Sequence, residues 1–135
     1  MSPKKIKIRQ EEKSAAADYL KKAEDNHAEM ILALQNKNYN AVGTLAIQRA
    51  ISSADAICVY EKGIRSISEV HLDVCELLKS LPLPDAKDKS NILKRIIAKK
   101  NIIQYERRSI YEKEAHEIAK SANRLYQWVI IVLTK

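Results

Sequence analysis

The sequence has very few of the residues that make turns. Of its 135 residues, two are glycine and three are proline, and phenylalanine is absent. Sandwiches and barrels of many short strands need glycine and proline at their turns, so all-β folds are excluded. Two glycines also cannot build the glycine-rich loops that hold phosphates in P-loop and dinucleotide-binding proteins.

Cysteines, metal-binding motifs and long apolar runs are scarce as well. Cys58 and Cys75 lack C-x-x-C spacing, so we expect two small core residues. No two histidines share a predicted helix, and we expect neither a metal nor a cofactor. The longest apolar run, Trp128 to Leu133, has six residues, whereas a membrane-spanning helix needs about 18. We expect a soluble protein without a membrane partner. Because residues 1–13 lack the apolar part of a secretory signal, we place it in the cytoplasm.

Positive charge is in excess and unevenly spread. The net charge is +7, and residues 86–113 alone hold nine basic and three acidic side chains, while residues 14–85 hold seven and ten. A basic segment on a mildly acidic body is expected of a site for phosphates, RNA or an acidic partner. A solvated, lysine-rich surface would give the same counts.

Apolar residues recur at spacings of three and four, which predicts helices at about 10–35, 39–62, 66–80, 88–101 and 109–133. The connections are too short to divide domains, so residues 1–135 form one domain, with a flexible basic terminus over residues 1–10. The predicted fold class is all-α, an up-and-down bundle of four to five helices.

Helix boundaries and faces can also be predicted. The second helix is apolar nearly all round, so we place it at the centre, and Gly63 ends it as a C-cap glycine. Ser66 with Glu69, and Ser109 with Glu112, match capping boxes that would open the third and fifth helices. The expected buried stripe of the first helix is Ala16, Leu20, Ala23, His27, Ile31 and Leu34. That of the last helix is Tyr111, Ala115, Ile118, Ala122, Leu125, Val129 and Val132.

The candidate binding site is the basic stretch between the fourth and fifth helices. Arginine and lysine neutralise phosphate, and tyrosine offers a ring on which a base can stack. The alternative is a basic helix end in which lysines meet the helix dipole and Tyr105 fills a loop. The candidate RNA- or phosphate-binding residues are Lys94, Lys99, Lys100, Asn101, Tyr105, Arg107 and Arg108.

Histidine is the usual acid or base at neutral pH. His27 lies on the expected buried stripe, so a core role is favoured. His71 follows the capping box of the third helix, and His116 has Glu112 one turn earlier, which is also the spacing of an ordinary surface pair. The minority catalytic candidates are therefore His116 and His71, with Arg108.

Nearly the whole chain resembles the HEPN family of small helical domains. The resemblance rests on residues 17–25 (ADYLKKAED), on 46–50 (AIQRA) with 54–56 (ADA), on Gly63, His71 and Leu77-Leu78, and on 125–129 (LYQWV). It implies a homodimer and, in active members, a metal-independent ribonuclease with an arginine and a histidine near the last helix. The matching positions here are Lys100, Asn101 and Tyr105, so lysine replaces the arginine and tyrosine the histidine.

That replacement affects the predicted chemistry. A phenol with a pKa near about 10 is a poor base at neutral pH, whereas imidazole near about 6.5 can deprotonate a ribose hydroxyl. The preferred hypothesis is a homodimeric HEPN-like module that binds RNA or nucleotides and is non-catalytic or weakly catalytic. The alternatives are a HEPN ribonuclease toxin paired with a nucleotidyltransferase-type antitoxin, and a helical protein-interaction scaffold.

Overall fold

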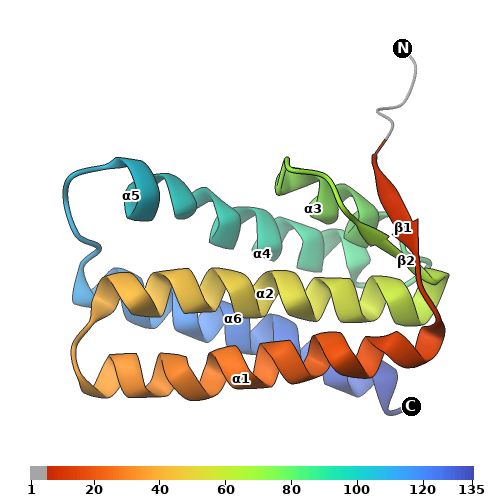
Figure 1. Cartoon of the computed structure of the whole chain (residues 1–135), viewed down its shortest axis with the longest axis horizontal. Helices are drawn as coiled ribbons and strands as arrows, with labels where there is room; N and C mark the ends of the chain where they lie inside the picture. Colours follow the sequence, from red (N-terminus) through yellow and green to blue (C-terminus); the bar gives the residue numbers. More distant parts are fainter. Residues whose placement is uncertain (1–5) are drawn as a thin grey trace.

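The computed structural model describes residues 6–135, and nearly all of its regular structure is helical (Figure 1). The long helices are α1 (Ala16–Gln35), α2 (Tyr39–Lys62), α4 (Ala86–Ala98) and α6 (Glu112–Leu133). The shorter ones are α3 (Leu72–Lys79) and α5 (Lys100–Tyr105), and a 3₁₀ turn precedes α1. The predicted all-α bundle is confirmed. No helix in the described part of the chain is long and apolar enough to cross a bilayer.

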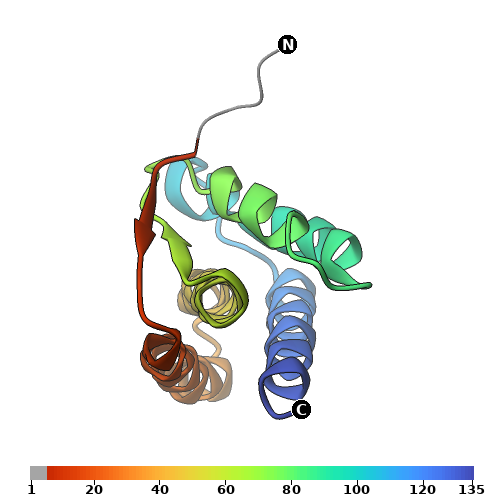
Figure 2. The same cartoon turned by 90° about the vertical axis from the view of Figure 1, so that its right-hand side faces the viewer.

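Helix α2 lies at the centre, as its composition predicted. Fourteen of its 24 residues are buried, and α1 and α6 pack on either side of it while α3 and α4 cover another face (Figure 2). Ala46, Ala50 and Ala54 are fully buried, and side chains this small let neighbouring helices approach its backbone closely. Gly63 ends the helix with a φ of 64°, the left-handed conformation that a C-cap glycine supplies.

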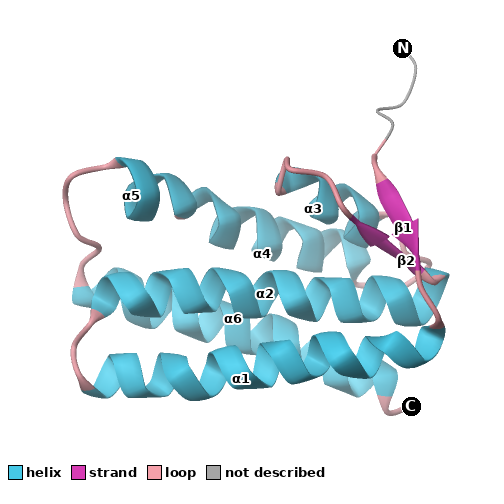
Figure 3. Ribbon diagram, in the orientation of Figure 1, coloured by secondary structure: helices cyan, strands magenta, loops and turns pink. Residues whose placement is uncertain are grey.

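A small two-stranded sheet was not predicted. Strand β1 (Ile8–Gln10) pairs antiparallel with β2 (Ile64–Ser66), which follows the turn at Gly63 (Figure 3). Residues 8–10 are therefore a strand rather than part of a flexible terminus, and residues 1–5 lie outside the described part. The capping box at Ser66 is wrong, because Ser66 belongs to β2 and its Oγ accepts a hydrogen bond from Ser68 N (3.3 Å).

The buried faces agree with the predictions in part. On α6, the predicted seam from Ala115 to Val129 is buried, but Tyr111 is exposed at the helix start. On α1 the stripe is rotated, since Tyr19, Met30 and Ala33 are buried while Ile31 remains 39% exposed. Both cysteines are buried and unpaired, which confirms their expected place in the core.

One arginine is buried among α1, α2 and α6. Arg49 is 2% exposed; its Nη1 donates to Asn123 Oδ1 (3.1 Å), and its guanidinium lies 4.3 Å from the centre of the Tyr126 ring. Tyr126 in turn donates to Glu24 Oε1 (2.9 Å). Among the described residues, Arg49 Nε and His27 Nδ1 are the buried side-chain atoms without a hydrogen-bond partner. Burial, and then the charge of Arg49, lower the pKa of His27, which is half-buried beside this cluster.

Replacing this arginine tests its contribution to stability. A buried charge whose hydrogen bond goes to a neutral amide is costly, so Arg49→Met should leave the free energy of unfolding unchanged or raise it by about 1–3 kcal/mol. The pKa of His27, followed by NMR titration, should rise because a nearby positive charge is gone. Chemical denaturation gives the first quantity. A loss of stability, or an unmoved His27 pKa, would contradict this account of the cluster.

Candidate nucleic-acid interface

The basic stretch is held in place by apolar contacts with the start of α2. A Cβ atom at Gly43 would lie 2.6 Å from Ile103 Cδ1 and 3.0 Å from Ile110 Cδ1, so both isoleucines rest directly on the glycine. Ile103 belongs to α5, and Ile110 is buried just before α6. The charged residues between them are therefore carried on a segment that is fixed at both ends.

A polar contact pins the same segment to α2. Asn40 Oδ1 accepts a hydrogen bond from Ile110 N (3.0 Å), and Asn40 Nδ2 donates to Ser109 Oγ (3.1 Å). The hydroxyl of Ser109 is thus engaged by another helix and does not cap α6. The predicted capping box of Ser109 with Glu112 is wrong, and the helix begins after Tyr111 instead.

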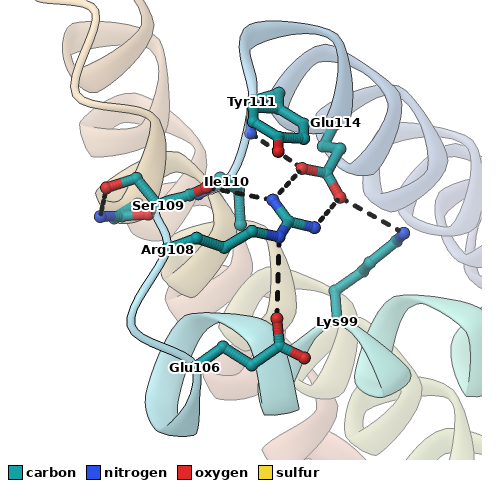
Figure 4. Close-up of polar contacts among 8 residues, drawn as sticks. Lys99, Glu106, Arg108, Ser109, Ile110, Tyr111 and Glu114 are labelled. Atoms are coloured by element: carbon teal, nitrogen blue, oxygen red, sulfur yellow. Dashed lines mark hydrogen bonds and ion pairs between the residues drawn. The ribbon is translucent and has the colours of Figure 1, made fainter.

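Glu114 caps α6 and also contacts two basic side chains, those of Arg108 and Lys99 (Figure 4). Its Oε1 accepts from Tyr111 N (2.8 Å) and from Arg108 Nη1 (2.9 Å), and its Oε2 accepts from Arg108 Nη2 (3.1 Å). Lys99 Nζ lies 3.9 Å from Glu114 Oε2. The hydrogen bonds from Arg108, followed by that from the Tyr111 amide, lower the pKa of Glu114 to about 2.

Three of the seven predicted binding residues therefore have acidic partners. Arg108 is held by Glu114 and also lies 3.7 Å from a carboxylate oxygen of Glu106. Lys99 shares Glu114, and Lys94 Nζ lies 3.4 Å from a carboxylate oxygen of Glu76. These three cations are partly neutralised within the protein, so less of their positive charge is available to attract a phosphate.

Another three of the predicted residues come together in a groove. It lies between residues 69–72 and the adjoining ends of α4 and α5, and has a volume of about 440 Å³. Its polar side chains are those of Glu69, His71, Lys100, Asn101 and Tyr105. Its apolar walls are Val70, Leu72, Ile97 and Ala98. We call this the His71–Tyr105 groove.

The groups in this groove are accessible. Tyr105 is 76% exposed, so its ring is open to a stacking partner, and Val70 and Leu72 are about half exposed. Within the described chain, no acidic group lies at ion-pair distance from Lys100. The predicted alternative in which Tyr105 fills a loop interior is wrong. Among the described residues, the groove presents the ammonium group of Lys100, one amide, one imidazole and one aromatic face, together with the carboxylate of Glu69.

His71 belongs to this groove, although sequence spacing gave no sign of it. His71 and Lys100 also line a narrower cleft beside Gln48 and Gln104. Burial, and secondarily the charge of Lys100, lower the pKa of His71. Both effects favour the neutral imidazole, which has a ring nitrogen that can accept a proton.

The remaining candidates lie elsewhere. Arg107 is exposed in the loop before α6 and has no acidic partner among the described residues. His116 Nε2 lies 3.8 Å from a carboxylate oxygen of Glu112, and both side chains are more than half exposed, as in an ordinary surface pair. Lys99 also lines a notch between α4 and α6 with Arg95 and Glu117. The seven residues thus do not form one concave surface.

No group of three or more potential metal ligands occurs in the described part of the chain. Comparison with known protein families, curated proteins and solved structures finds no match to this chain. The function is therefore argued from the groove itself.

The pKa of Glu114 predicts how stability depends on pH. A carboxyl group with a folded pKa of about 2 and an unfolded value near about 4.3 stabilises the fold fully above about pH 5, and loses that contribution as the pH falls toward 2. Glu114→Gln should therefore be less stable than the natural protein by about 0.5–1.5 kcal/mol at pH 7. The two proteins should converge as the pH approaches 2 in denaturant titrations.

Glu117→Gln is the matched control, because Glu117 is exposed on the same helix and has no ion pair among the described residues. It should lie within about 0.5 kcal/mol of the natural protein at every pH. If the free energies of unfolding of Glu114→Gln and Glu117→Gln depend on pH in the same way, Glu114 does not stabilise the segment that precedes α6.

Proposed function

We propose that the protein binds single-stranded RNA or nucleotide phosphates in the His71–Tyr105 groove, as a HEPN-like module. The observation that carries the proposal is that Lys100, Asn101 and Tyr105 line one open groove with His71. Lys100, Asn101 and Tyr105 are the positions that the resemblance aligns with the HEPN motif, with lysine in place of its arginine and tyrosine in place of its histidine. The homodimer and the nucleotidyltransferase-type partner implied by the resemblance remain predictions.

The chemistry of the groove suits one nucleotide unit. Lys100 has an ammonium group without an acidic partner in the described chain, and it can pair with a phosphate. Asn101 supplies a donor and an acceptor for a base edge or a ribose hydroxyl. The Tyr105 ring, exposed beside Val70 and Leu72, supports stacking of an unpaired base.

The surrounding charge supports the same function. Residues 86–113 are strongly basic, and Arg107, just beyond α5, adds a guanidinium that has no acidic partner among the described residues. Glu69 is the acidic member of the groove and partly offsets Lys100. The number of phosphates bound should therefore be small, about two.

Salt dependence and substitution test the proposal. For a labelled single-stranded RNA of about 12 nucleotides, the logarithm of the association constant should fall with the logarithm of salt concentration with a slope near about −1.4, which corresponds to two phosphates. Lys100→Ala should reduce the slope by about 0.7, because one of these contacts is lost. Tyr105→Ala should weaken binding by about 1–3 kcal/mol. Fluorescence anisotropy measures both effects.

Lys94→Ala is the matched control, since it removes the same charge from a lysine that pairs with Glu76. It should retain nearly all of the affinity. Equal losses of RNA affinity in Lys94→Ala and Lys100→Ala would show that only the net charge of the protein matters. An affinity that does not change with salt concentration would exclude phosphate binding.

The position of His71 favours a second candidate function, an endoribonuclease. A neutral imidazole beside Lys100 could take the proton of a ribose 2′-hydroxyl while the lysine stabilises charge on the attacked phosphate. Cleavage of single-stranded RNA should then disappear in His71→Ala and persist in His116→Ala. Cleavage that survives in both variants would exclude a histidine base, and absence of cleavage in the natural protein leaves the binding function alone.

A further inference from the structure

A second open groove lies at the opposite end of the bundle from α5, where α1 begins and α6 ends (Figure 1). At this end α1 and α6 lie on either side of α2 (Figure 2). The groove has a volume of about 500 Å³ and mostly apolar walls. The apolar lining residues are Ala16, Ala17, Leu20, Tyr60, Ile130 and Leu133.

A hydrogen bond joins α1 to α6 just beyond the lining residues of the groove. Tyr126 of α6 donates to Glu24 Oε1 of α1 (2.9 Å), and these residues lie one helical turn beyond Ile130 and Leu20. The contact ties the two helices together next to the groove. A helix of a second molecule would need a longer apolar seam, so the shape fits a small ligand better.

Positive charge marks one end of the groove. Lys13 is the charged residue among those that line it, and its Nζ lies 4.1 Å from the centre of the Tyr60 ring. Neither Lys13 nor the hydroxyl of Ser14 has an acidic or hydrogen-bonding partner in the described chain. Glu12 and Asp18 line a different groove together with Tyr19 and Lys22. A cation that rests on an aromatic ring, and a hydroxyl donor, thus lie beside an apolar surface, and neither has an acidic partner among the described residues.

The geometry points to a binding site for an aliphatic carboxylate, with the carboxylate at Lys13 and Ser14 and an unbranched hydrocarbon chain along Leu20, Ile130 and Leu133. One carboxylate oxygen would pair with the ammonium group, and the other would accept from the hydroxyl. The hydrocarbon chain would cover side chains that are now only partly buried. This site does not depend on RNA binding.

Isothermal titration with octanoate, decanoate and decanol tests the site. Each added methylene should tighten binding about two- to fourfold, because it removes apolar surface from water. Decanoate should bind more tightly than decanol, which lacks the charge. In Lys13→Gln that preference should disappear, while binding of decanol stays the same.

Leu20→Glu and Leu32→Glu form a matched pair on α1. Leu20 lines the groove, whereas Leu32 is 51% exposed and is not among its lining residues. Leu20→Glu should abolish decanoate binding with unchanged helical circular dichroism, and Leu32→Glu should bind as the natural protein does. Equal affinity for octanoate and decanoate, or unchanged binding in Leu20→Glu, would overturn the proposal. So would a dimer in sedimentation that Leu20→Glu converts to monomer, because a second copy would then cover the groove.

Discussion

The burial of α2 on nearly all sides is the constraint on which the rest of the structure depends. Its small side chains allow α1 and α6 to lie close on either side, and Gly43 allows Ile103 and Ile110 to rest on its first turns. The position of α5, and with it that of Lys100 and Tyr105, follows from these contacts. A side chain at residue 43 would move the groove before it changed the fold.

The second determinant is how the positive charges are divided. Glu114 accepts two hydrogen bonds from Arg108 while it caps α6. One carboxylate therefore orders the loop and also occupies the guanidinium group of Arg108, which could otherwise have bound a phosphate with two hydrogen bonds. Glu76 faces Lys94. Counting basic residues along the chain therefore overstates the charge available to a ligand. Among the described residues, Lys100 and Arg107 have no acidic partner, so the candidate site is limited to the groove and the loop beside it.

Local signals predicted the helices well. Composition placed α2 at the centre, Gly63 marked its end, and the regular spacing from Ala115 to Val129 identified the buried face of α6. The β1–β2 pair was missed, because two three-residue strands more than 50 residues apart have no local pattern. Both S-x-x-E motifs misplaced a helix start, since each serine is bonded or paired elsewhere.

Only one side of the His71–Tyr105 groove could be predicted from the sequence. Lys100, Asn101 and Tyr105 are close in sequence, so a shared surface could be expected from helical spacing. His71 comes from a segment some 30 residues earlier, between β2 and the start of α3 at Leu72, and it lines the same groove as Lys100. The acidic partners of Arg108 and Lys94 were missed for a similar reason, since neither pair lies at the i, i+4 spacing of one helix.

The most direct test of the central claim is an NMR titration of the labelled protein with a short single-stranded RNA. The account predicts that the amide and side-chain signals of residues 69–72 and 97–105 shift together and saturate at one affinity, while those of Lys94 and Glu76 stay in place. Shifts centred on other surfaces, or none at all, would contradict it.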